Sequence, residues 1–247
     1  MKQWKAYENL ARYDHIIADL EEYEEEVRRY KDEIESHLGK GRKSMLHFGS
    51  GAGGHDYHLK QDFDVTGVDV SEGMLEVATG LNPQVTYVKG DMRDMELNQQ
   101  FDVVFIPESI MYMTTLADVE RVLANAERHL KPRGLLLVMV QTKEEFQENN
   151  FVYSGKKDGI QVDLFENNTI VSTESYEAVM VYLIREDGEL TIESDVHTLG
   201  LFPKAAWVKS LSEIGAIRRT WRMDDRYDHW IEGEGEYPQT IFTIQKS

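Results

Sequence analysis

The chain contains no cysteine, which excludes disulfide bonds, thiolate metal sites and a cysteine nucleophile. Its eight histidines show no HExxH or comparable ligand spacing, so the sequence predicts no metal site. Long hydrophobic runs are also lacking: the longest, residues 135–140, is far too short to cross a bilayer. The first ten residues, MKQWKAYENL, have no apolar stretch of the kind found in signal peptides. We therefore expect a cytoplasmic protein with no membrane partner.

Basic residues are scarce relative to acidic ones. Among 247 residues there are 27 Lys and Arg against 45 Asp and Glu, a formal net charge of −18. Such a chain repels polyanions at long range, and its clearest basic cluster, Arg218–Arg219, is short, so no nucleic-acid partner is predicted. The length and the 41% hydrophobic content are those of a globular protein with one large domain or a domain with an insertion. A neutral or cationic small substrate suits this charge best.

A glycine-rich turn stands out at residues 45–55, MLHFGSGAGGH. A short apolar run followed by glycines predicts a strand, a tight turn and a helix start, with backbone amides directed at a ligand. Asp69 follows Gly49 by 69 − 49 = 20 residues and closes the apolar run 64–70. At that offset an acidic side chain can hold a ribose, so the pattern predicts a nucleoside cofactor. Gly49, Gly51 and Gly54 also satisfy G-x-G-x-x-G, which leaves NAD or FAD open.

Apolar runs and helical segments alternate from residue 43 to residue 140. We expect strands at 44–49, 64–70, 85–91, 101–106 and 135–140, with helices at 72–79 and 116–130 among the segments between them. This alternation predicts an α/β fold, a Rossmann-like doubly wound sheet that is mostly parallel. Ligands bind at the carboxyl ends of such strands, where Gly49, Asp69, Asp91 and Pro107 all fall.

The remaining segments suggest additions to this sheet. Three alternating runs, 160–170, 175–187 and 189–202, predict an inserted antiparallel sheet with turns at Asn167–Asn168 and Asp187–Gly188. Strands at 217–223 and 240–245 should form a closing antiparallel hairpin after a helix at 203–214. We therefore divide the chain into a helical lid (1–42), a cofactor-binding domain (43–146 and 203–247) and an inserted sheet (147–202). The inserted strands offer edges that could pair between two chains in a homodimer, or be covered within one chain.

Two further segments narrow the cofactor. Residues 85–95, VTYVKGDMRDM, place Asp91 after the third strand, and residues 130–134, LKPRG, precede the fifth. Together with the glycine turn and Asp69, they resemble the class I S-adenosylmethionine-dependent methyltransferases over residues 43–140. His47 stands where that family usually has an acidic residue, two positions before the first glycine. The resemblance implies that the methionyl part is held by Gly49, Gly51 and Gly53, the ribose by Asp69, the adenine by Asp91 and Met92, and that Val70, Met74 and Pro107 lie beside them.

The flanks, YENLARYDHIIAD and HTLGLFPKAAWVKSLSEIGA, look like small-molecule N-methyltransferases of the nucleotide-sugar amine and glycine or sarcosine types. The resemblance implies methyl transfer from S-adenosylmethionine to a small acceptor, with an amine nitrogen favoured. It also implies that the inserted sheet, 147–202, roofs the acceptor pocket or makes a dimer contact. An NAD-dependent oxidoreductase and a non-catalytic binding protein on the same fold are the alternatives.

Four residues are candidates for work on the acceptor. Tyr13 matches the family's lid tyrosine and could assist proton loss, or could simply pack the lid. Tyr112 follows the fourth strand and could orient the acceptor, or be a packed aromatic. His197, near the end of the last inserted strand, could face the pocket, or be an ordinary strand residue. Glu108 could pair with a cationic acceptor, or be a solvated or helix-capping carboxylate.

Overall fold

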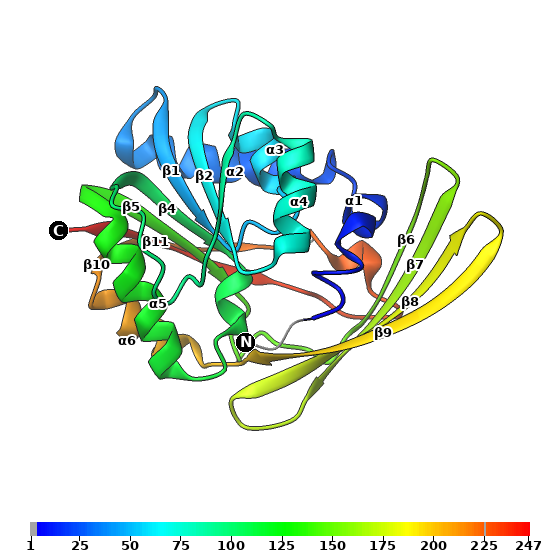
Figure 1. Cartoon of the computed structure of the whole chain (residues 1–247). Helices are drawn as coiled ribbons and strands as arrows, with labels where there is room; N and C mark the ends of the chain where they lie inside the picture. Colours follow the sequence, from blue (N-terminus) through cyan, green and yellow to red (C-terminus); the bar gives the residue numbers. More distant parts are fainter. Residues whose placement is uncertain (1–3, 225) are drawn as a thin grey trace.

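The computed structural model describes residues 4–224 and 226–247, which form two β-sheets with helices packed on the larger one (Figure 1). The larger sheet has seven strands in the order β10-β11-β5-β4-β1-β2-β3. Neighbouring strands pair in parallel except that β11 runs antiparallel to both β5 and β10. The predicted Rossmann-like sheet with an antiparallel closing hairpin is confirmed. Its strands are β1 Lys43–Phe48, β2 Phe63–Asp69, β3 Thr86–Lys89, β4 Phe101–Pro107, β5 Leu130–Val140, β10 Gly215–Met223 and β11 Gln239–Lys246.

Helices cover both faces of this sheet because side chains alternate along each strand. On β1, Met45 packs in one core cluster with α2 (Glu22–Leu38) and α3 (Gly54–Leu59). The next residue, Leu46, packs in another with α5 (Leu116–His129) and α6 (Lys204–Ser212). The fourth helix, α4 (Glu72–Leu81), begins at Ser71, whose hydroxyl accepts a hydrogen bond from the Met74 amide at 3.1 Å.

The second sheet has four antiparallel strands in the order β6-β7-β8-β9 and is inserted between β5 and α6. Its strands are β6 Asn150–Lys157, β7 Ile160–Ile170, β8 Ser175–Glu186 and β9 Glu189–Gly200. The predicted turn at Asp187–Gly188 is confirmed, with φ of 53° and 83°. The predicted turn at Asn167–Asn168 is wrong: both residues pair with β8 inside β7, opposite Val179 and Ala178. The first strand, β6, was not predicted.

The N-terminal segment lies between the two sheets (Figure 1). It contains the 3-10 turn η1 (Ala11–Tyr13) and the short helix α1 (Asp14–Ile17) before α2. The segment packs closely on the inserted sheet, since a Cβ at Gly155 of β6 would overlap the backbone carbonyl of Ile16. Two more 3-10 turns, η2 (Ser109–Tyr112) and η3 (Asp228–Trp230), follow β4 and β10. Within the described residues, no helix is long and apolar enough to cross a membrane.

Candidate active site

A cavity of about 450 Å³ opens at the carboxyl ends of the parallel strands. It lies where the strand order reverses between β1 and β4, the position at which open α/β sheets bind ligands. Its volume is in the range of small-molecule sites. Besides the sheet rim, residues of the N-terminal segment and of the inserted sheet line it, among them Trp4, Tyr7, Asp14, Tyr23, Phe151, Tyr153, Glu166, Tyr176, Ala178, Met180 and Leu199.

The glycine turn forms one wall. Gly49 and Gly51 have φ of 70° and 52°, a region that side chains disfavour. A Cβ at Gly49 would overlap the side chain of Ser109, so this position accepts glycine alone without rearrangement. Gly53 has φ of 80° but begins α3 and sits against Asn82, and it does not line the cavity. The turn therefore provides the expected cradle through Gly49 and Gly51, whereas Gly53 shapes the helix start.

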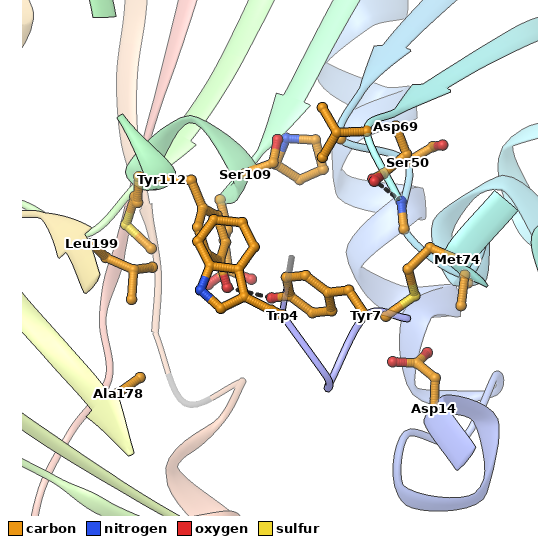
Figure 2. A pocket seen from close by; sticks show the side chains of 18 of the residues that line it. Trp4, Tyr7, Asp14, Ser50, Asp69, Met74, Ser109, Tyr112, Ala178 and Leu199 are labelled. Carbon is orange, nitrogen blue, oxygen red and sulfur yellow. Dashed lines mark hydrogen bonds between the residues drawn. The ribbon is translucent and has the colours of Figure 1, made fainter. Parts of the chain in front are cut away.

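Asp69, at the end of β2, ties the turn to its neighbouring strand. One carboxylate oxygen accepts a hydrogen bond from the Gly51 amide (Figure 2) and the other from the Ser71 amide, each at 2.9 Å. Burial raises the pKa of Asp69, and the two amides oppose that effect. Each oxygen keeps a second lone-pair site, and the carboxylate lines the cavity. The structure thus leaves Asp69 able to accept two further hydroxyl groups.

Asp91 lies on the same rim, after β3. It forms an ion pair with Arg93 at 2.6 Å and accepts the Arg93 amide at 2.9 Å. Burial alone would raise the pKa of Asp91, but the Arg93 guanidinium and amide outweigh it and lower the pKa. Four more predicted cofactor residues line the cavity beside it: Val70, Met74, Met92 and Pro107. Of the nine residues predicted for the cofactor, all but Gly53 therefore meet at one cavity.

His47 does not line the cavity. The alternation along β1 turns it toward α3, where its Nδ1 lies 2.7 Å from a carboxylate oxygen of Asp56. Tyr87 donates a hydrogen bond of 2.9 Å to the other oxygen of Asp56. The substitution of a histidine for the family's acidic residue is thus accompanied by a buried acid nine residues later, beneath the turn.

A chain of hydrogen bonds runs from the cavity into the inserted sheet. The hydroxyl of Tyr7 bonds that of Tyr112 (Figure 2). The Tyr112 hydroxyl in turn lies 2.7 Å from Nδ1 of His197. Nε2 of His197 lies 3.1 Å from a carboxylate oxygen of Asp195. Burial would raise the pKa of Asp195, but the Ala6 amide and His197 outweigh it and lower the pKa. An ionised Asp195 only accepts, so Nε2 of His197 carries the proton and Nδ1 accepts the hydroxyl of Tyr112.

The chain of hydrogen bonds revises the expected acceptor-side residues. Tyr112 lines the cavity as expected, whereas His197 is fully buried behind it. Tyr13 is buried, but its hydroxyl donates to Glu186 on β8 at 3.1 Å and also contacts Arg12, and it does not line the cavity. The 3-10 turn η1 directs the ring of Tyr13 away from the cavity, and Tyr7 is the tyrosine near it in the sequence that lines the cavity instead. Asp195 was not predicted, and Tyr7 was not among the predicted acceptor-side residues, although the aromatic spacing of residues 4–13 was an available signal for it.

Glu108 also lines the cavity, at the end of β4. Its φ is 56°, unusual for a residue with a side chain, and its carboxyl group contacts the side-chain amide of Gln239. Burial and the neighbouring Glu26 raise the pKa of Glu108 to about 7. Its side chain does not cap η2, so the helix-capping interpretation is wrong.

Comparison with known proteins agrees with this geometry. Residues 46–138 match the family model described as a methyltransferase domain. The chain is 34% identical over 98 residues to a dTDP-4-amino-2,3,4,6-tetradeoxy-D-glucose N,N-dimethyltransferase of Saccharopolyspora spinosa, covering 39% of each chain. It is 27% identical over 177 residues to a dTDP-3-amino-3,4,6-trideoxy-alpha-D-glucopyranose N,N-dimethyltransferase of Streptomyces venezuelae, covering 70% of this chain and 74% of that one.

A solved structure shares the fold over most of the chain. The S-adenosylmethionine-bound amino pentose methyltransferase CalS10 of Micromonospora echinaspora superposes with a TM-score of 0.72 at 20% identity, covering 91% of this chain and 92% of that one. At 20% identity, this similarity shows only that the two proteins share a fold. The methyltransferase-domain match over residues 46–138, the strand order and the glycine turn agree with the resemblance to the class I S-adenosylmethionine-dependent methyltransferases.

Proposed function

We propose that this protein transfers the methyl group of S-adenosylmethionine to an amine nitrogen of a small molecule. The observation that carries the proposal is the continuity of the cavity. Gly49, Asp69 and Asp91 line it on the side of the central sheet, and Tyr112 and the inserted sheet line it on the other. A methyl donor and an acceptor can therefore meet in one enclosed space. The relatives named as N,N-dimethyltransferases of amino sugars support nitrogen as the acceptor atom.

The residues at the rim fit the methyl donor. The turn at Gly49 and Gly51 is a cradle that a Cβ would fill, and Asp69 has two lone-pair sites left for ribose hydroxyls. Asp91, fixed by Arg93, is an acceptor for the adenine amine. When bound, the donor supplies a carbon made electrophilic by its positive sulfur.

The chemistry asked of the protein is positioning and proton removal. With the donor bound, the lone pair of the amine would form the new N–C bond while the C–S bond of the donor breaks. The electron pair of the broken C–S bond would stay on sulfur. The amine proton passes to Tyr112 as Tyr112 gives its own proton to Nδ1 of His197, and Asp195 stabilises the resulting imidazolium. Trp4 and Tyr7 cover this part of the cavity and exclude water.

The chain's three parts take separate roles in this proposal. Residues 1–42 act as a lid, because Trp4, Tyr7, Asp14 and Tyr23 line the cavity from the N-terminal side. Residues 43–146 and 203–247 hold the donor. The inserted sheet, 147–202, forms the acceptor wall through side chains such as Tyr153 and Glu166.

The opposite face of the inserted sheet supports a homodimer. Val152, Phe165, Leu183 and Ile192 are exposed there, with Phe165 at 42% and Ile192 at 63%. A mass measurement on the eluting species during size-exclusion chromatography tests this contact. The wild type should elute as a dimer and Phe165→Glu as a monomer, and a monomeric wild type would refute the contact. A cytoplasmic location and the absence of a nucleic-acid partner remain predictions from the charge and the sequence.

The test is methyl transfer itself. The protein is incubated with S-adenosylmethionine carrying a radiolabelled methyl group and a panel of primary and secondary amines that includes amino sugars. We expect label in at least one amine and loss of most of that transfer in Tyr112→Phe, with little change in Tyr13→Phe. Binding of the donor without transfer to any amine would favour the non-catalytic alternative. Hydride transfer from NADH to a carbonyl substrate would favour the oxidoreductase.

A further inference from the structure

The half of the cavity that faces the inserted sheet contains two carboxyl groups without a cationic partner. Glu108 lies at the end of β4 and Glu166 on β7. Glu166 accepts a hydrogen bond of 3.0 Å from the side-chain amide of Asn168, and Glu108 contacts that of Gln239. In the described part of the chain, no Lys or Arg forms an ion pair with either carboxyl group. Both side chains are partly exposed to the cavity and otherwise enclosed by protein. A carboxylate in such a site without a counter-charge is costly, and a cationic ligand would remove that cost.

Tyrosines surround these two carboxyl groups. They come from α2, β6, β8 and the connection between β10 and β11, and they are Tyr23, Tyr153, Tyr176, Tyr227 and Tyr237. The rings of Tyr227 and Tyr237 meet edge to face with centroids 5.7 Å apart. Aromatic faces attract ammonium groups, most strongly when water is excluded. The hydroxyls of Tyr23 and Tyr153 make no hydrogen bond to the described residues, so both are free to contact a ligand.

The cationic side chains on the described walls already have carboxylate partners, and one of them, His55, lies 2.9 Å from Glu26. Arg93 is the one Lys or Arg among the described residues that line the cavity, and it pairs with Asp91 at 2.6 Å and with Asp118 at 3.3 Å. Arg226, next to Tyr227, contacts the Glu22 carbonyl and lies 3.6 Å from Glu26. Recognition of a diphosphate depends on charge-assisted hydrogen bonds from such side chains, and both are already engaged.

We infer that the acceptor is a small organic cation without a phosphate group, an amine held between Glu108, Glu166 and the tyrosine walls. The assignment rests on the proposed methyl transfer and makes it more specific. It separates this protein from the relatives whose names specify dTDP-linked amino sugars. The ammonium form is held by the two carboxylates and the aromatic rings, and it gives one proton to Tyr112, along the path to His197, before the freed lone pair attacks.

The test uses calorimetry on the full chain saturated with S-adenosylhomocysteine. The probes are tetramethylammonium, its neutral counterpart of similar shape tert-butanol, and thymidine 5′-diphosphate, all at one ionic strength. We expect tetramethylammonium to bind at least about tenfold more tightly than tert-butanol, a factor equal to about 1.4 kcal/mol, and thymidine diphosphate not to bind. Equal binding of the cation and the alcohol, or binding of the diphosphate, would overturn the assignment.

Two variants and a control locate the cation. Glu166→Gln and Glu108→Gln should each raise the Kd for tetramethylammonium by about tenfold or more. Glu189→Gln, at an exposed position on β9, should leave its affinity unchanged. S-adenosylhomocysteine affinity reports whether each variant keeps its fold. Unchanged cation affinity in both pocket variants would place the cation elsewhere and refute the inference.

A pH series on the wild type adds a readout that needs no variant. The charged groups that act on Glu108 are Glu26 on α2, His55 on α3 and Glu166 on β7, beside the amide of Gln239 on β11. Since the pKa of Glu108 is about 7, its ionisation alone should strengthen cation binding about tenfold from pH 6 to pH 8. Deprotonation of His55 acts in the same direction, so Glu108→Gln should show a smaller rise. A cation affinity that falls with rising pH would contradict the inference.

The two proposals can fail separately. If S-adenosylhomocysteine does not bind, the proposed function and the acceptor assignment both fall. If it binds and tetramethylammonium shows no advantage over tert-butanol, the methyltransferase proposal stands and the cationic acceptor is refuted.

Discussion

Replacement of Asp69 by asparagine tests the ribose contact without changing the side chain's shape. The carboxylate accepts the Gly51 and Ser71 amides at 2.9 Å each, and an asparagine can accept only one of them. It also loses the charge that strengthens a hydrogen bond to a ribose hydroxyl. Hydrogen bonds to charged groups contribute about 1.5–3 kcal/mol, so the Kd for S-adenosylhomocysteine should rise between about tenfold and about 140-fold.

Isothermal titration at pH 7 measures this change, and Asp64→Asn is the matched control. Asp64 lies on the same strand but is exposed, and it pairs with Arg42 at 2.5 Å. Because exposed ion pairs contribute about 0–1 kcal/mol and this one is remote from the cavity, the control should keep its affinity within about twofold. A folded Asp69→Asn protein that binds S-adenosylhomocysteine as tightly as the wild type would refute the role of Asp69.

Three further predictions concern the turn, the hydrogen-bond chain and pH. Gly49→Ala should lower the free energy of unfolding by about 2–4 kcal/mol, from overlap with a neighbouring side chain and a positive φ. Gly159 has a φ of 85° but open space around it, so Gly159→Ala should lower the free energy of unfolding by only about 1–2 kcal/mol. Urea denaturation measures both variants, and an equal loss of stability in the two would contradict the packing argument. Tyr112→Phe should reduce kcat at least about tenfold and flatten the dependence of kcat on pH, whereas Tyr13→Phe should alter neither. A Tyr112→Phe variant with the kcat of the wild type would exclude the proton path. Because the folded pKa of Glu108 is raised to about 7, the native state binds the extra proton between pH 4.5 and 7 and stability falls as pH rises through this window. Glu108→Gln should therefore raise the Tm more at pH 8 than at pH 5, and equal shifts would show that Glu108 is not buried as described.

The central sheet was predictable because its strands carry strong local signals. Apolar runs such as 44–49 and 85–91 end at glycine or acidic residues, and the hydrophobic pattern of the central strands is set by burial on both faces. Ser71 directly precedes the predicted helix 72–79 and is a residue type that commonly caps helices, and in the structure its hydroxyl accepts the Met74 amide. The carboxyl-end markers Gly49, Asp69 and Asp91 followed from the rule that parallel strands end at one rim.

The inserted sheet was less predictable because long-range pairing overrides local preference there. Asn167 and Asn168 favour turns, yet they pair with β8, and their side-chain amides find partners in Asn150 and Glu166. The first inserted strand, 150–157, follows a polar stretch and was therefore missed.

The acceptor side depends on contacts between segments far apart in the sequence. The choice between Tyr7 and Tyr13 depends on how a 3-10 turn directs each ring, and the bond between Tyr112 and His197 joins residues 85 positions apart. Sequence spacing alone sets neither. The pairing of His47 with Asp56 was equally hidden, although the two residues lie only nine positions apart.

The most direct test of the account is a calorimetric titration of the purified protein with S-adenosylhomocysteine, with NAD in parallel. The cavity formed by the glycine turn, Asp69 and Asp91 predicts micromolar binding of S-adenosylhomocysteine and no binding of NAD. Binding of NAD without binding of S-adenosylhomocysteine would contradict the account and assign the glycine turn to a dinucleotide. Binding of neither would show that these residues no longer form a cofactor site.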